Sequence, residues 1–419
     1  MTVSVPVGTT GTVRLHPLST QADDDPDSVI VGRPELGEFV SLPALYGKAI
    51  ELLGDGLPIG VVQREIEEQH DVELDVVQLV EVLVELGFVA RLNGTDLPDP
   101  AEKAPPAHLP WLAERHVRWL FGRPVLVLWA FVAGAALVTL FGRPDLVPVY
   151  QDFFWGDYIG LTTLVNTAMF SVVISLHELM HLAAARSLGT PARIGFGTRL
   201  HNLVVQTDVT AIWSVPRRSR YRVYLAGTAC DLFLLATLLL VLAHGNPPEG
   251  VAALLRALAL VITLSVPLQM HVYMRTDFYF VLADLLRCRD LFGDGLGYAR
   301  HLLRRVVAVV RRARPPADPS AELSARERRA VRIYAVLLVP SATLALGVFG
   351  LYTLPIIVDS LIRALVAVWD GLSGGPVLLG IDGGLFLLVE GGIQTLFVIT
   401  FVRSHPHWFR RRSVVPGVR

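Results

Sequence analysis

Six long apolar runs constrain the fold of this chain more than any other feature. They cover residues 120–141, 159–185, 223–243, 251–273, 333–356 and 377–402 of a 419-residue sequence. A helix crosses a hydrocarbon layer roughly 30 Å thick with about 20 residues, so every run is long enough to span a membrane. The composition agrees, because 52% hydrophobic and 18% charged residues are too apolar a balance for a soluble enzyme of this length. We therefore predict a mainly α-helical, polytopic membrane protein with about six transmembrane helices.

The distribution of arginine predicts the side of the membrane on which each loop lies. Positively charged residues are retained on the cytoplasmic side of short loops. Arginines follow the second run at positions 186, 193, 199, 217, 218, 220 and 222. The loop before that run contains one arginine, Arg143, and the loop after the third run contains none. A second arginine-rich stretch, residues 275–332, falls on the same side. We expect a multi-pass protein of the cytoplasmic membrane with both termini in the cytoplasm.

The segments outside the apolar runs indicate further parts. Residues 1–28 are polar and acidic, and we expect a disordered tail because so little apolar surface can be buried there. Residues 29–92 combine short β-prone runs with three stretches of helical periodicity, which indicates a small cytoplasmic α+β domain. Residues 93–119 are rich in proline and typical of a linker. The membrane domain then covers residues 120–403, and residues 404–419 form a cytoplasmic tail.

The second apolar run contains two histidines, His177 and His181, with Glu178 between them. Histidines four residues apart leave the same face of a helix, so both imidazoles can bind one Zn²⁺. Glu178 stands beside them as a general base for a catalytic water. Counted from Ile159 at about 1.5 Å per residue, His177 lies about 27 Å along this helix. Ionisable groups are costly within apolar sequence, which favours a functional site over a histidine pair satisfied by neighbouring helices.

A third metal ligand must come from elsewhere, because a catalytic zinc has three protein ligands and one open position. Asp277 follows the fourth apolar run at a compatible depth, and we choose it as the third ligand. Its other interpretation is a helix cap at the membrane interface. Asp284 lies two helical turns later and either supports the ligands or faces solvent.

These residues resemble the site-2 protease family of intramembrane zinc metalloproteases, whose motif joins a membrane-embedded HExxH to a distant Asp-Gly pair. The resemblance covers roughly residues 160–290. Leu225–Asp231 is similar to Ala-Gly-Pro-x-x-Asn, and Asp277–Leu286 is similar to Asp-Gly-Tyr-Tyr-x-Leu-x-Asp-Leu-Leu. The latter pattern belongs to a bacterial branch often linked to modified-peptide biosynthesis. The resemblance implies an intramembrane zinc endopeptidase with the ligands and the general base named above.

Four positions depart from the family pattern. Phe278 replaces the Gly after the third ligand, Thr228 replaces Pro, Asp231 replaces Asn, and Met180 stands where Gly is common. None of them removes a metal ligand or the base. Phe278 narrows the space beside the third ligand, and Asp231 adds a charge where the family has an amide. Asp231 is either a polar helix-packing residue or a partner of the site.

The order of strands and helices in residues 29–92 resembles the winged-helix, PqqD-like module of enzymes that mature ribosomal peptides. This resemblance implies that the domain binds a leader peptide as an added strand. DNA binding is the competing role of a winged helix. Four basic residues face twelve acidic ones in this range, which leaves eight net negative charges, and duplex DNA requires phosphate neutralisation. We therefore expect no nucleic-acid partner. A docking domain for another protein is the remaining alternative.

The leading hypothesis is a zinc endopeptidase that cleaves a peptide or a membrane-anchored protein near the cytoplasmic leaflet, in the maturation of a ribosomally made peptide. Regulated intramembrane proteolysis of a transcription regulator is a second hypothesis, weakened by the lack of an evident PDZ-like insertion between the apolar runs. A third is a non-catalytic docking partner of a peptide exporter, although a scaffold has no need of buried ionisable groups. The expected partners are the bilayer, the substrate and the leader peptide.

Overall fold

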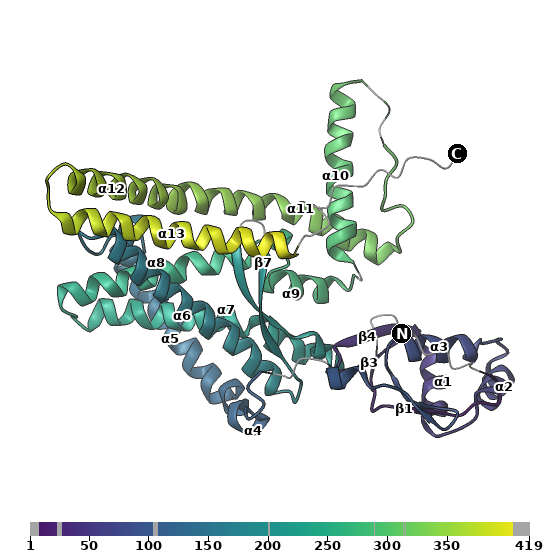
Figure 1. Ribbon diagram of the computed structural model, residues 1–419. Coiled ribbons are helices and arrows are strands. Elements are labelled where there is room, and N and C mark those ends of the chain that lie inside the picture. Colours follow the sequence, from purple (N-terminus) through teal and green to yellow (C-terminus); the bar gives the residue numbers. More distant parts are fainter. Residues whose placement is uncertain are drawn as a thin grey trace. The chain divides into compact units, whose positions relative to one another are not determined.

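The computed structural model describes residues 8–22, 27–103, 108–199, 202–288, 290–312, 314 and 316–404 (Figure 1). The chain divides into two compact units. The first comprises Met1–Phe121, His181–Arg193 and Thr207–Val223, and the second comprises Gly122–Met180, Ile194–Gln206 and Tyr224–Arg419. Two long helices, α6 (Ile159–Arg186) and α7 (Arg217–His244), contribute to both units.

The N-terminal part of the first unit holds two small antiparallel sheets, which confirms the predicted strand-containing domain. One sheet has the order β1-β5-β6 and the other the order β2-β3-β4. The strands are β1 (Val13–Leu15), β2 (Ser19–Ala22), β3 (Ser28–Arg33), β4 (Glu38–Pro43), β5 (Val89–Leu92) and β6 (Thr95–Asp96). The helices are α1 (Ala44–Gly54), α2 (Ile59–His70) and α3 (Val76–Glu85). Gly37, with φ of 71°, provides the left-handed residue that the tight turn between β3 and β4 requires.

The core of this domain forms where the apolar faces of the helices meet the strands. Val76, Leu79 and Leu83 recur at helical spacing on α3, and all three are buried. The side chain of Asp75 accepts a hydrogen bond from the backbone N–H of Gln78 and caps this helix. Phe88, which directly precedes β5, is fully buried in the same cluster. A compact α+β domain follows from these local patterns.

The expected disordered tail over residues 1–28 is wrong where the structure describes it. Val13 is only 4% exposed and joins the hydrophobic core, and β1 pairs with β5 nearly 80 positions further along the chain. Composition missed this strand because its partner is distant in the sequence and because so short a strand brings only Val13 and Leu15 to the core. Residues 1–7 and 23–26 lie outside the described residues.

The predicted linker over residues 93–119 also carries structure. It contains β6, the short 3₁₀ helices Pro100–Lys103 and Arg118–Phe121, and the single turn α4 (Glu114–Val117). Its residue Asp99 pairs with the buried Arg33, whose guanidinium also donates to the carbonyl of Gly87. This contact holds the first part of the segment against β3. Residues 104–107 and the tail residues 405–419 lie outside the described residues.

The Arg33–Asp99 pair predicts a pH-dependent stability of the N-terminal domain. The hydrogen bond from Arg33 holds the pKa of Asp99 below its ordinary value of 3.8. A lowered pKa stabilises the folded state above pH 3.8, and this contribution is lost as the pH falls through the folded pKa. In the full chain, we expect Asp99→Asn to speed amide hydrogen exchange in β5 at neutral pH and to have no effect well below pH 3.8. Glu35→Gln, an exposed partner of the same arginine, is the matched control. Equal exchange in Asp99→Asn and the unaltered chain at neutral pH would contradict the prediction.

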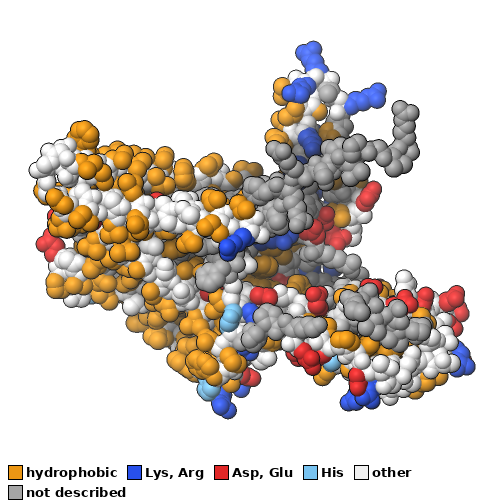
Figure 2. Space-filling view, viewed as in Figure 1, with side chains coloured by type: hydrophobic (Ala, Val, Ile, Leu, Met, Phe, Trp, Pro, Cys, Tyr) orange, Lys and Arg blue, Asp and Glu red, His pale blue; other side chains and the backbone are white. Residues whose placement is uncertain are grey.

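The second unit is built mainly from long helices. The further elements are α5 (Arg123–Gly142), α8 (Glu249–Gln269), α9 (Asp277–Leu286), α10 (Leu291–Val310), α11 (Ala325–Val348), α12 (Leu354–Leu372), α13 (Val377–Ser404) and the two-stranded pair β7 (Arg193–Arg199) and β8 (Asn202–Asp208). Within the described residues, six helical stretches are long and apolar enough to cross a membrane, as the sequence predicts. Apolar side chains cover much of their outer surface (Figure 2). These features indicate a multi-pass membrane protein.

The fifth candidate span is longer than the predicted run of residues 333–356. It is a helical stretch of 48 residues, Ala325–Leu372, in which α11 and α12 are joined by a π-helical turn at Phe349–Thr353. Pro355 explains this turn, because a proline lacks the N–H for an α-helical bond and crowds the preceding turn. At about 1.5 Å per residue, 48 residues extend about 72 Å, more than twice the hydrocarbon thickness. The predicted run was limited by Arg332 and Asp359, because charged residues lower the hydropathy of a segment. The helix itself continues through both residues.

Two close contacts attach the last helix to its neighbours. Gly371 and Gly380 let α12 and α13 approach backbone to backbone, because a Cβ at Gly380 would lie 3.1 Å from the Cα of Gly371. Asp382 on α13 is buried, and its carboxylate accepts hydrogen bonds of 2.9 Å from the backbone N–H groups of Gly160 and Leu161. A carboxylate is favourable at a helix N-terminus. Asp382 therefore caps the helix that carries the histidines.

Helix α11 holds the connection between α8 and α9 in place. The hydroxyl of Tyr334 donates to the carbonyl of Val272, and the hydroxyl of Ser341 donates to the carbonyl of Met270, both over 3.1 Å. Thr276 Oγ1 closes the connection by donating to the carbonyl of Gln269 over 2.6 Å. The start of α9, at Asp277, is positioned by these bonds.

Candidate metal centre

Helix α6 carries His177 and His181 one turn apart, so that both imidazoles leave the same face. Both residues are buried, with exposures of 1% and 6%. The next turn, Leu182–Ala185, is also buried, and its three alanines allow neighbouring backbone to approach closely. The histidines therefore lie in the protein interior.

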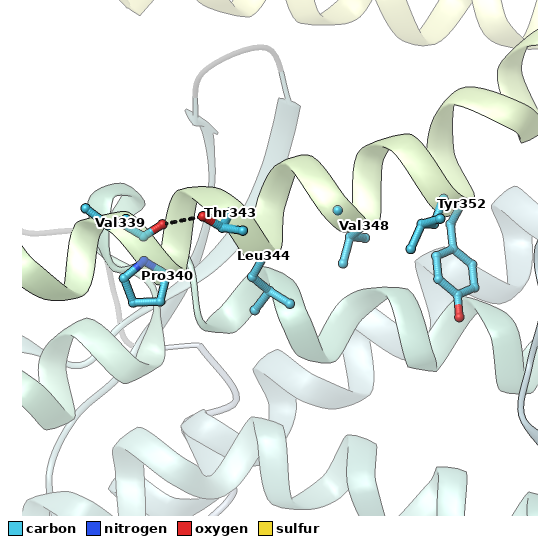
Figure 3. A pocket seen from close by; sticks show the side chains of 8 residues that line it. Val339, Pro340, Thr343, Leu344, Val348 and Tyr352 are labelled. Atoms are coloured by element: carbon cyan, nitrogen blue, oxygen red, sulfur yellow. Dashed lines mark hydrogen bonds between the residues drawn. The ribbon is translucent and has the colours of Figure 1, made fainter.

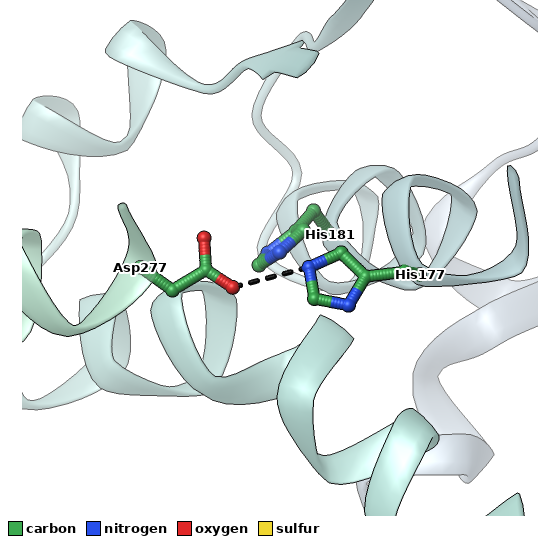
Figure 4. Close-up of side chains that lie close together, drawn as sticks. All are labelled: His177, His181 and Asp277. Carbon is green, nitrogen blue, oxygen red and sulfur yellow. Dashed lines mark hydrogen bonds and ion pairs between the residues drawn. The ribbon is translucent and has the colours of Figure 1, made fainter. Parts of the chain in front are cut away.

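Asp277 faces the two histidines from the first position of α9 (Figure 4). Its Oδ2 lies 3.2 Å from Nε2 of His177. One donor atom from each of Asp277, His177 and His181 lies within 4.8 Å of the other two. Thr228 Oγ1 donates to the same Oδ2 over 3.5 Å. The structure thus brings together the three residues that the sequence predicts as metal ligands.

The second nitrogen of each ring has a partner that determines the tautomer. Nδ1 of His177 lies 2.9 Å from Oδ2 of Asp231, and Nδ1 of His181 lies 2.7 Å from the carbonyl oxygen of Val223. A carbonyl oxygen only accepts, so Nδ1 of His181 must carry a proton. The carboxylate of Asp231 favours the same arrangement at His177. Both Nε2 atoms then keep their lone pairs for a metal, the usual arrangement of a ligating histidine.

Asp231 is itself held in place. It is 1% exposed, and Ser265 Oγ donates to its Oδ2 over 3.0 Å. In the structure Asp231 contacts His177 directly. The charge that this residue brings into an apolar helix is located where a bound cation would offset it.

The separation between two of the candidate ligand atoms matches that in a tetrahedral zinc site. Ligand atoms about 2.0–2.1 Å from a zinc ion lie about 3.3 Å from one another, close to the 3.2 Å between His177 Nε2 and Asp277 Oδ2. Two imidazoles and one carboxylate leave at least one coordination position open, as hydrolytic zinc sites do. The same set of donors also binds Fe(II) in oxygenases, so the ligands alone leave the metal undetermined.

Glu178 and Asp284 are the remaining residues that the sequence predicts for the site. Glu178, next to His177 on α6, is 8% exposed. Asp284 is buried on α9, and the three-residue cluster does not include it. Sequence reasoning missed Ser265 and Gln269, whose Nε2 lies 3.4 Å from Nε2 of His177. In the sequence, each of these two residues is marked only as a polar side chain within the apolar run that forms α8.

One groove of the described structure lies away from this cluster. It follows α11 and the π-helical turn and is lined mainly by apolar residues, among them Val339, Leu344, Val348 and Tyr352 (Figure 3). The hydroxyl of Thr343 is satisfied by the carbonyl of Val339, one turn back along the helix. The groove offers no acid or histidine, and its chemistry suits a hydrocarbon chain better than a polar substrate.

Comparison with known proteins adds no assignment. No protein-family model matches this sequence, and no match was found among curated proteins or among solved structures. The candidate metal centre is therefore defined by its own geometry, a buried His177–His181–Asp277 group able to bind a metal ion.

Proposed function

We propose that this chain is a zinc-dependent intramembrane endopeptidase of the site-2 protease type. The observation that carries the proposal is the convergence of His177, His181 and Asp277, with Glu178 beside them on the same helix. The two histidines are buried on a candidate membrane span, where ionisable groups are costly and usually functional, and the partly buried carboxylate of Asp277 reaches them from α9. Zinc is preferred to iron because Glu178 supplies the proton acceptor that hydrolysis needs.

Each residue has a defined role in this reaction. When bound, zinc supplies Lewis-acid polarisation of the scissile carbonyl and of the attacking water. Glu178 accepts the proton of that water and transfers it to the leaving amine. Asp231 and the Val223 carbonyl hold the imidazoles in the orientation that directs Nε2 inward. The substrate backbone must be locally extended to reach these groups, and we propose that it pairs with β8.

The N-terminal domain supports a role in peptide maturation. In the described part of the chain, β3 is the only strand that pairs with β4. We propose that a leader peptide adds a strand along the other edge of β4 (Glu38–Pro43), where alternate residues point their backbone groups away from β3. We propose that this edge retains the leader while the following segment enters the membrane domain on the cytoplasmic side. The expected substrate is a ribosomally made peptide or a membrane-anchored protein.

Zinc content tests the proposal. In the detergent-purified full chain we expect about one zinc ion per chain. His181→Ala and Asp277→Ala should lose the metal because each removes one of three ligands. Glu178→Gln should retain it, and Asp284→Ala is the matched control, since it removes a buried aspartate of the same helix outside the cluster. A folded, unaltered chain that binds no zinc, or that binds iron in preference, would overturn the assignment.

A further inference from the structure

Helix α10 carries an exposed apolar face that the proposed reaction does not use. Leu303, Val306 and Val310 are 66%, 61% and 79% exposed. They recur at spacings of three and four residues, so they share one face of the helix. Isolated exposed apolar residues are ordinary on a protein surface, but a continuous apolar stripe indicates a contact surface.

The other face of α10 is strongly basic. Arg300, Arg304 and Arg311 are exposed and recur at spacings of four and seven residues. Between residues 300 and 314 the sequence contains six arginines and no acidic residue. Figure 2 shows Lys and Arg side chains around the tip of this helix and apolar atoms along its flank. A helix that is basic on one face and apolar on the other is typical of the boundary between headgroups and hydrocarbon.

Contacts with α11 place α10 at the level of that boundary. Gly295 lies directly against the ring of Tyr334, and the guanidinium of Arg332 lies over Tyr298 at 5.8 Å. Arg332 is the last of four arginines in the first turns of α11, and no charged residue follows until Asp359. The change from arginine to apolar sequence marks the point at which a span enters hydrocarbon. Figure 1 shows α10 running across the direction of α11, as a helix in the membrane plane would.

We propose that α10 lies in the membrane plane and binds the anionic headgroups of the leaflet at the Arg332 end of α11. The apolar face enters the upper part of the hydrocarbon, and the arginines contact phosphates. Acidic lipids match the charge of this segment, which bears no acidic residue of its own between positions 300 and 314. The proposal rests on membrane insertion of the six candidate spans and does not depend on the metal chemistry.

Spin labels on the full chain in lipid nanodiscs test the placement. Cys230 and Cys288 are first replaced by serine, and single labels are introduced at Val306→Cys on the apolar face and at Arg304→Cys on the basic face. In phosphatidylcholine discs containing phosphatidylglycerol, the label at 306 should collide with oxygen and be shielded from a water-soluble nickel chelate. The label at 304 should show the reverse. A label at Val336→Cys, 67% exposed on α11, confirms that the span itself is inserted.

The lipid requirement is tested by charge. The protection of position 306 should be lost in discs of phosphatidylcholine alone, and in the triple variant Arg300→Gln, Arg304→Gln, Arg311→Gln. Three arginines at an acidic surface correspond to about a hundredfold change in association. Equal chelate access at 306 and 304, with 336 inserted, would overturn the proposal. A label at 306 shielded from both reagents would overturn it in favour of a protein partner. Immersion that is the same in both lipids would overturn the anionic-headgroup assignment.

Discussion

Glu178→Gln is expected to lower peptide-bond hydrolysis by a factor of about 10² to 10⁴ without changing the zinc content of the protein. Glutamine has nearly the same size as glutamate and keeps an acceptor oxygen, but it cannot take up the proton of the attacking water. Because Glu178 is not one of the three clustered ligands, the metal should remain bound. We therefore attribute the expected loss of hydrolysis to proton transfer and not to loss of the metal.

The measurement uses a library of unfolded peptides incubated with the full chain in detergent, with new termini detected by mass spectrometry. This readout does not require the natural substrate. Glu178→Asp is the informative companion, because it retains a carboxylate on a shorter side chain and should recover part of the activity. Cleavage by Glu178→Gln at the rate of the unaltered protein would exclude Glu178 as the general base.

Asp231→Ala is expected to weaken zinc binding about 10- to 100-fold although Asp231 is not itself a ligand. Its carboxylate lies 2.9 Å from Nδ1 of His177 and holds the ring so that Nε2 points toward Asp277. Without that partner the imidazole can rotate or adopt the other tautomer. Asp231→Asn keeps an acceptor for the same N–H and should recover part of the affinity.

Chelator competition on the purified full chain would measure this affinity, with helicity from circular dichroism as the check on folding. Ser265→Ala should have a smaller effect in the same direction, because Ser265 acts only through Asp231. Thr263→Ala, another hydroxyl of α8, is the matched control. If Asp231→Ala bound zinc as tightly as the unaltered chain, the orienting role of Asp231 would be refuted.

The candidate site could be predicted in part. The spacing of His177 and His181 on one apolar run points to a shared metal, because helical geometry alone places them on one face. Helical spacing could not decide between Asp277 and Asp284, because both follow the fourth run and lie two helical turns apart. The structure separates them, because the hydrogen bonds that hold the α8–α9 connection place Asp277 next to His177.

Local composition by itself located the six candidate spans among the described residues, although not the length of the fifth, because the apolar surface of a membrane-length helix depends only on its own residues. Tertiary structure decided that Val13 belongs to a core, that Asp231 faces His177, and which acid completes the cluster. Each of these depends on a partner tens of residues away, such as the 54 positions between His177 and Asp231. Contacts of that kind arise from how helices pack, and neither periodicity nor composition encodes the register of one helix against another.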